Sequence, residues 1–413
     1  MSRVMMKNRM WTKTELAAGQ GAARVLIRTL LVGLVSAGLI SVAQAGPREQ
    51  ARRIHDRLAG VPPTEAVLVS METDVDPFQN NDPLAAAYTA MGNPNFYNVT
   101  LKNFAAPWTN RDQSVFVPLN DYIATVIGMI RDEVPFNTLL SADLLYVGAV
   151  GLPIAGYSPS SNQHYADIES QGLDMSDTGV LEQRVQSTLA GSVPGHATAG
   201  IITSRGAAEA FFVAGTNRAM FRFTMMNHMC NDMEQIHDVK RIPDRIRQDV
   251  SRSPGGDSRL FLNNCIGCHN GMDPLAGAFA YYNYNDATGN IEFTDGVVQP
   301  KYFNNEDNFP FGYVTTDDSW LNYWRSGQNE FLGWDLTLPG SGNGAKSLGR
   351  EFGNSDAFAS CQVKKVFKAV CLREPEDQPD RDQVATMIGT FKAGGLYSMK
   401  RVFADAAVYC MDP

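Results

Sequence analysis

The sequence contains no apolar run of the roughly 20 residues that a membrane-spanning helix requires. Its most apolar segment, residues 29–42, follows a basic stretch and precedes the small-x-small tripeptide of residues 43–45. This combination is typical of a secretory signal peptide that is removed by cleavage. We therefore predict a signal peptide over residues 1–45, a periplasmic or otherwise extracytoplasmic location, and no membrane span in the mature chain. The alternative is an uncleaved membrane anchor.

Positive charge is scarce once this segment is removed. Residues 1–45 hold six Lys or Arg and one Glu, so the mature chain keeps 29 basic against 43 acidic side chains, a formal charge of −14. Such a surface repels phosphates and argues against nucleic acid as a partner. It permits a basic protein partner, because attraction between opposite charges speeds encounter. It can equally serve only to keep an exported protein soluble.

Histidine and cysteine are also sparse, with six of each, and one stretch concentrates them. Residues 265–269 have the pattern C-x-x-C-H. No second C-x-x-C and no H-x-x-x-H supplies the other ligands of a structural zinc site, and no βαβ setting for a thioredoxin-like redox pair is evident. A disulfide between Cys265 and Cys268 would leave His269 unexplained. The pattern is the attachment signature of a c-type haem.

Each side chain of this motif has its own task in haem attachment. The thiols of Cys265 and Cys268 add to the two vinyl groups of haem, and His269 becomes the proximal ligand of the iron. We therefore predict one covalently bound haem c. In bacteria this attachment takes place outside the cytoplasmic membrane, which agrees with the predicted export signal.

The ligand on the other face of the iron is harder to place, because no histidine follows His269. Residues 216–238 show helical spacing of Met and His, which are usual distal ligands. The distal candidates are Met229, Met225, His228 and, in the last predicted helix, Met399. The alternatives are a Met-rich core helix, since Met fills irregular gaps, or an iron with no protein ligand on that side. Met272 is excluded because it lies only three residues past His269.

Four further cysteines in an oxidising compartment predict two disulfides. Two of them, Cys361 and Cys371, lie ten residues apart in one predicted helix, so their Cα atoms would be roughly 15 Å apart. A disulfide cannot span that distance. Each is therefore expected to pair with Cys230 or Cys410, in an order that the sequence leaves open; free buried thiols are the alternative.

Helical periodicity prevails over the rest of the chain, interrupted by long polar stretches. We predict a mainly α fold, a helical c-type cytochrome domain with long irregular loops and little β structure. Its parts would be an N-terminal mainly helical region over 46–215 and a haem-binding region with a C-terminal helical module over 216–413. Predicted helices cover 47–63, 119–149, 204–214, 216–238, 356–371 and, broken at Gly394-Gly395, 381–408; loops cover 70–118 and 150–176, and 290–350 carries local β structure.

Four segments resemble the planctomycete-type secreted cytochrome c-associated family. They are RRIHDRLAGVPPT, PFNTLLSADLLYVG, CIGCHNGMDPLAGAFAYYNYND and FASCQVKKVFKAVCLREP. In that family C-x-x-C-H is followed by a Met/Ile-Asp-Pro turn and an Asp-x-x-Gly, and a terminal helical module has a Cys and an Arg-x-Pro-like ending. The resemblance runs in pieces from about residue 50 to the C-terminus. It implies haem c, a mainly helical fold and an extracytoplasmic site, but no substrate. The chain departs from the pattern at residues 276–281, where the usual acid is missing.

One haem and an acidic surface favour one-electron transfer with a redox protein partner over a stand-alone enzyme. The chain is far larger than an electron carrier requires, which leaves two alternatives: a haem c oxidoreductase acting on a small substrate or peroxide, and a haem-stabilised binding or sensor protein. An electron carrier predicts that both axial positions of the iron are filled, whereas the alternatives predict an open distal face. The sequence leaves the distal ligand, the redox potential, the partner and the oligomeric state open.

Overall fold

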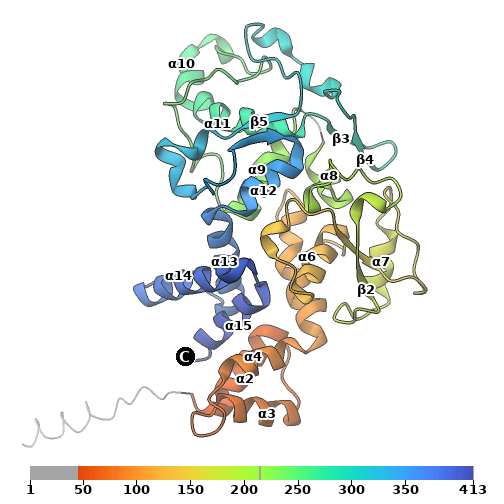
Figure 1. The fold of residues 1–413 in the computed structure, drawn as a ribbon, viewed down its shortest axis with the longest axis vertical. Helices are drawn as coiled ribbons and strands as arrows, with labels where there is room; N and C mark the ends of the chain where they lie inside the picture. The colour runs from red at the N-terminus through yellow and green to blue at the C-terminus, as the bar shows by residue number, and fades with distance from the viewer. Residues whose placement is uncertain (1–44, 214, 413) are drawn as a thin grey trace, which may run out of the picture. The chain divides into compact units, whose positions relative to one another are not determined.

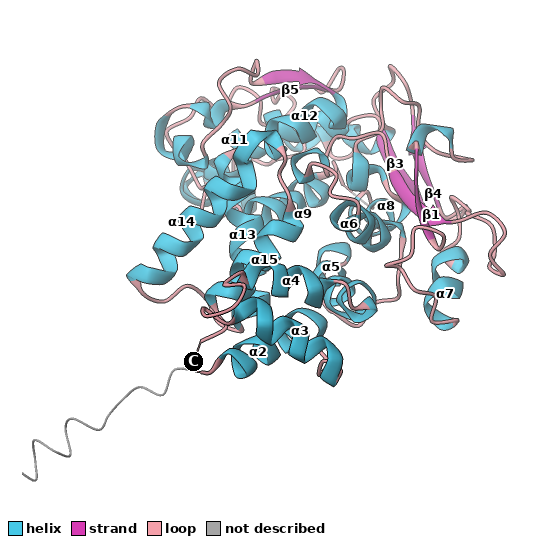
Figure 2. Ribbon diagram, turned by 60° about the horizontal axis from the view of Figure 1, so that its bottom comes forward, coloured by secondary structure: helices cyan, strands magenta, loops and turns pink. Residues whose placement is uncertain are grey.

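Short helices make up most of the computed structural model, which describes residues 45–412 except residue 214. In this part of the chain the strands form three antiparallel sheets of two strands each, set among the helices (Figures 1 and 2). The predicted mainly α fold with little β structure is therefore confirmed. The predicted signal peptide lies outside the described residues, apart from Ala45.

Helix α2, Pro47–Ala59, agrees with the prediction and ends at Gly60, whose positive φ of 71° suits glycine. The prediction of irregular structure over 70–118 was wrong for most of this stretch and is confirmed for residues 110–118. Within this stretch a polar residue starts a helix instead of a loop, since the side chain of Asp82 caps α4. The elements of this stretch are α3 Glu65–Val75, α4 Pro83–Met91, η1 Phe96–Leu101, α5 Lys102–Ala105 and η2 Ala106–Thr109.

Helix α6, Asp121–Arg131, is buried along its whole length and ends earlier than the predicted 119–149. Pro135 explains the difference, because it lacks an N–H and disfavours helical backbone at the residue before it. The chain continues through η3 Phe136–Thr138, β1 Leu145–Gly148, α7 Gln163–Ser170, β2 Leu181–Arg184, η4 Gln186–Thr188, η5 Gly200–Thr203 and α8 Arg205–Phe211. Helix α7 thus lies within a stretch predicted as loop.

Helix α9, Arg218–Met229, ends well before the predicted residue 238. Cys230 ends it in the left-handed region with φ 51°, and a disulfide ties Cys230 to Cys361. The segments that follow are η6 Pro254–Gly256, α10 Ser258–Leu260, η7 Phe261–Cys265, α11 Ile266–Ala276, η8 Gly277–Phe279, β3 Tyr282–Asn285, β4 Asn290–Phe293, η9 Pro300–Phe303, η10 Glu306–Asn308, β5 Ser319–Leu321, η11 Tyr323–Arg325, η12 Gly327–Leu332 and β6 Ser341–Asn343.

The C-terminal helical module agrees closely with the prediction. Its elements are α12 Gly344–Gly353, α13 Asp356–Cys371, α14 Gln378–Lys392, η13 Ala393–Gly395 and α15 Met399–Tyr409. The break at Gly394, with φ 61°, lies where it was expected. Cys361 and Cys371 stand at different positions of α13 and do not pair with each other, as predicted: the disulfides are Cys230–Cys361 and Cys371–Cys410.

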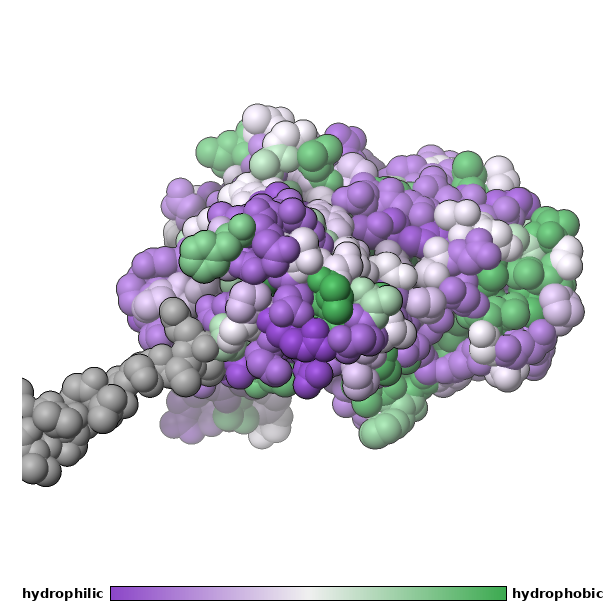
Figure 3. Space-filling view, turned by 90° about the horizontal axis from the view of Figure 1, so that it is seen from below, coloured by the Kyte–Doolittle hydropathy of each residue, from purple (hydrophilic) through white to green (hydrophobic). Residues whose placement is uncertain are grey.

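One large hydrophobic core runs through the unit Pro47–Asp412 and includes residues of both predicted regions. The first helices pack on the last one: the rings of Phe96 and Phe403 lie 5.2 Å apart, and Figures 1 and 2 show α2 and α4 beside α15. Toward α2 and α3, hydrophilic residues cover most of the surface, with groups of hydrophobic residues between them (Figure 3). No described helix is both long and apolar enough to cross a membrane.

Candidate cofactor site

The three residues of the C-x-x-C-H motif lie at the start of one helix. Cys265 ends the π-helical stretch η7, and Cys268 and His269 follow in the first turn of α11. Spacings of three and four residues bring side chains onto neighbouring positions of one helix face. Both thiols are free and partly exposed, in contrast to the other four cysteines. The Sγ atom of Cys268 lies 3.6 Å from the carbonyl oxygen of Met233.

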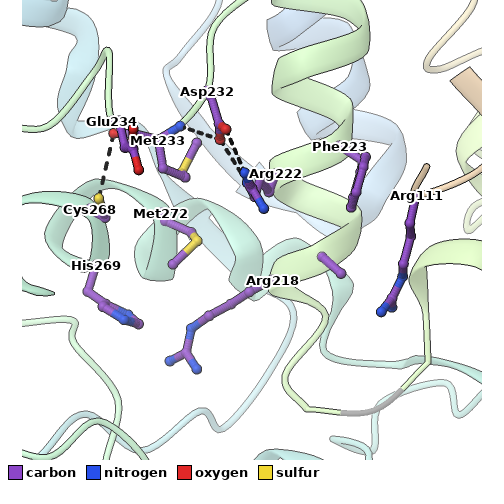
Figure 4. Close-up of a pocket in the computed structure, with 11 residues that line it drawn as sticks. Arg111, Arg218, Arg222, Phe223, Asp232, Met233, Glu234, Cys268, His269 and Met272 are labelled. Atoms are coloured by element: carbon purple, nitrogen blue, oxygen red, sulfur yellow. Dashed lines mark hydrogen bonds and ion pairs between the residues drawn. The ribbon is translucent and has the colours of Figure 1, made fainter. Parts of the chain in front are cut away.

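A cavity of about 640 Å³ opens beside this face of α11 (Figure 4). Its volume lies within the range of roughly 300–1,000 Å³ that is usual for ligand and cofactor sites. Its walls combine apolar side chains with three arginines and two acids. The lining residues come from α11 (Cys268, His269, Met272), from α9 (Arg218, Ala219, Arg222, Phe223), from the turn after α9 (Asp232, Met233, Glu234) and from Arg111.

A buried carboxylate anchors the imidazole of His269. Asp273 follows one helical turn later, and its Oδ1 lies 3.1 Å from His269 Nδ1. With Nδ1 engaged in this way, Nε2 is the ring nitrogen that remains for a ligand-binding role.

Two further charged residues fix Asp273 in place. Arg218 donates to both of its oxygens, at 2.7 and 2.9 Å, and also to both oxygens of Asp249, at 2.6 and 2.9 Å. The backbone N–H of Arg247 donates to Asp273 Oδ2 at 3.2 Å. Burial alone would raise the pKa of Asp273, but Arg218, His269 and Arg247 together hold it well below its usual range. Asp273 thus lies behind His269 as a buried carboxylate that is also paired with Arg218.

The opposite face of α11 is fixed by close packing at two glycines. Asp238 donates its backbone N–H to the carbonyl oxygen of Gly267 at 2.9 Å, and the ring of His237 lies directly over Gly267. The indole of Trp324 lies against Gly271 in the same way: a Cβ atom there would come within 2.2 Å of its Nε1. Both contacts require that residues 267 and 271 have no side chain. Together they set the orientation of α11 about its axis, which turns Cys268 and His269 toward the cavity.

The substitution Gly271→Ala is expected to destabilise the protein by about 1–3 kcal/mol, the usual cost of overpacking a core. Alanine would favour the helix itself by about 1 kcal/mol, but Trp324 is fully buried and has no room to move away. Urea unfolding measures the change. Gly389→Ala in the helix α14 is the matched control, because no atom lies within 4 Å of a Cβ there. Equal stability of the two variants would contradict the packing argument.

The four distal candidates lie in the hydrophobic core, and none of them lines the cavity. In α9, the residues that line the cavity are on the face of Arg218 and Arg222. His228 is buried on another face, where its Nε2 meets the hydroxyl of Tyr122 at 2.7 Å. Burial, together with the nearby Lys365, holds the pKa of His228 well below its usual value. Ser355 donates to Met229 Sδ at 3.3 Å, and Met225 and Met399 are likewise almost fully buried.

Most residues that the structure adds to the site are not evident from the sequence. The methionines on the cavity are Met233 and Met272, which lie in a turn and next to the motif. Asp273 lies four positions after His269, a spacing that marks helical neighbours and could have identified it. Arg218 could not have been found in this way, because its contact with Asp273 joins residues 55 positions apart.

No protein-family model, curated protein or solved structure matches the chain. The residues present fit a c-type haem: two free thiols stand at the attachment spacing, and the imidazole between them and Asp273 keeps one nitrogen available beside a cavity of suitable size. In the described part of the chain, no group of three or more His, Cys, Asp or Glu side chains is arranged to hold a metal ion.

Proposed function

We propose that this protein is an exported c-type cytochrome that binds one haem covalently and transfers electrons to a redox protein partner. The observation that carries the proposal is the placement of Cys268 and a carboxylate-anchored histidine on the cavity, with the free thiol of Cys265 one helical turn before them. The resemblance to the planctomycete-type secreted family agrees with this function but stays a prediction.

The residues of the site divide the work of holding a haem. Cys265 and Cys268 would tether it and His269 Nε2 would bind its iron, while Asp273 keeps the imidazole oriented. Bound haem supplies a reversible one-electron couple between ferric and ferrous iron. Apolar walls such as Phe223 would exclude water from the macrocycle, and the exposed Arg111 and Arg222 would be the cations available to its carboxylates.

Two general features support the proposed setting. The disulfides Cys230–Cys361 and Cys371–Cys410 are typical of proteins in oxidising compartments, in line with export. The formal charge of −14 on the mature chain permits attraction to a basic redox partner.

A second candidate function is an oxidoreductase that acts on a small substrate or peroxide, or a sensor that binds a small ligand. The observation that favours it is the cavity itself, which none of the four distal candidates enters and which Arg111 and Arg222 line. An iron without a protein ligand on its distal side can bind a substrate there. The two functions therefore differ in one property, the occupancy of the sixth coordination position.

Visible spectra of the exported, purified protein separate the two. We expect covalent haem with a low-spin spectrum in the oxidised and reduced states, and no change when carbon monoxide is added to the reduced form. Ready binding of carbon monoxide would contradict electron transfer through a six-coordinate iron and favour the second candidate function. Absence of covalent haem would contradict both.

A further inference from the structure

We infer that Asp273 is a positioning residue that lowers the reduction potential of a haem bound through His269. The inference rests on the proposed function and extends it, since it assigns the tuning of the site to one side chain. It stands on a geometry that is already present in the protein chain and does not depend on the identity of the distal ligand.

The contact with Asp273 sets the orientation of the imidazole of His269. A carboxylate can only accept a hydrogen bond, so the short contact of 3.1 Å places the proton of His269 on Nδ1 and the lone pair on Nε2. Ligating histidines commonly donate their other N–H to a carboxylate, a backbone carbonyl or water, and this partner sets the ring orientation and basicity. Of these partners, the carboxylate is the one that carries a full negative charge.

The charge of the Asp273 carboxylate also changes the electron density of the imidazole. An N–H that donates to an anion leaves more electron density on the imidazole, and a more basic ligand stabilises ferric iron more than ferrous iron. Asp273 is only 2 % exposed, so water screens this effect little. The expected result is a lower potential than a neutral acceptor at the same place would give.

The carboxylate of Asp273 is held rigidly by residues of other segments. Arg218 clamps Asp273 from α9 through two hydrogen bonds and is itself held by Asp249, while Arg247 donates to Asp273 from a third segment. These donors compete with His269 for the carboxylate and moderate its effect. The potential should therefore respond in opposite directions to the loss of the carboxylate charge and to the loss of the clamp.

The decisive variant is Asp273→Asn, which keeps the shape of the side chain and an oxygen acceptor but removes the charge. We expect its potential, measured by spectroelectrochemical titration, to rise. The ratio of reduced to oxidised protein at a fixed applied potential should increase by about tenfold, a size taken from the lower end of the roughly 10–100-fold effect that such partners have on metal affinity or activity. Asp249→Asn is the matched control. It removes the other carboxylate charge that is paired with Arg218, but Asp249 does not contact His269.

An unchanged potential in Asp273→Asn, or an equal rise in Asp249→Asn, would overturn the inference. If Asp273→Asn does not retain haem, Arg218→Lys is the deciding variant. The single ammonium of lysine binds fewer lone pairs of the Asp273 carboxylate, which leaves a stronger hydrogen bond for His269, so the potential should fall. An unchanged or higher potential in this variant would overturn the inference. A wild-type protein without covalent haem would instead refute the proposed function, which keeps the two failures distinct.

Discussion

A protein with both Cys265→Ala and Cys268→Ala is expected to carry no covalent haem, which is a complete loss and not a graded one. Thioether bonds to these two sulfurs are the only covalent links that the attachment motif provides. The two thiols are free and accessible before attachment, since neither takes part in a disulfide. Haem staining after denaturing gel electrophoresis measures the loss, because only covalently bound haem survives denaturation.

Each single variant should keep stain, since one thioether bond remains in it. The double variant Cys371→Ala with Cys410→Ala is the control, because it removes two cysteines far from the cavity and should keep its haem. Haem stain in the Cys265→Ala, Cys268→Ala variant would disprove attachment at this motif. Two reactive thiols and no stain in the exported wild-type protein would disprove attachment altogether.

Loss of the disulfide Cys230–Cys361 is expected to lower the free energy of unfolding by about 5 kcal/mol, at the upper end of what one disulfide contributes. The bond closes a loop of 131 residues, so it restricts the unfolded chain strongly. It also holds Cys230 in the left-handed backbone that ends α9 and joins that helix to α13. Urea unfolding of the double alanine variant under oxidising conditions measures the change.

The second disulfide provides the comparison. Cys371–Cys410 closes a loop of only 39 residues, and the same loop-entropy argument gives about 4 kcal/mol for its removal. A loss below about 1 kcal/mol for Cys230–Cys361 would show that the unfolded chain is already restricted by other means. A loss confined to α9 and the cavity, with the C-terminal helices intact, would show that the two parts unfold separately.

The sequence was most informative where local pattern and local chemistry coincide. The C-x-x-C-H motif, the helix that begins at residue 356 and the break at Gly394 depend on neighbours in the chain. The exclusion of a bond between Cys361 and Cys371 needed only the rise of a helix. Polar capping residues such as Asp82 caused the errors over 70–118, because Asp and Pro mark helix starts as well as turns.

Helical periodicity in the sequence does not predict which side chains of the candidate site lie close together. Spacing in α9 places Met225 and Met229 on the face of Arg218 and Arg222, but it does not tell how far along that face the cavity extends. The contacts of Arg218 with Asp249 and Asp273 depend on how α9 packs on α11, so they belong to the tertiary structure. A tertiary partner also decides where α9 ends, since Cys361 holds Cys230.

The packing of the first helices on the last one has a consequence for the order of folding. Gln50 bonds to Asp412 at 2.8 Å and Arg57 to the carbonyl of Val370 at 2.9 Å, contacts that span more than 300 residues of chain. Contacts of such sequence separation slow folding, because the loop between them must close before they form. Helices α2 and α4 emerge early during synthesis, yet they meet α15 only at the end of it. The apolar surface through which α2 and α4 contact α15 therefore stays uncovered while most of the chain is made, and this exposure favours aggregation of the incomplete chain.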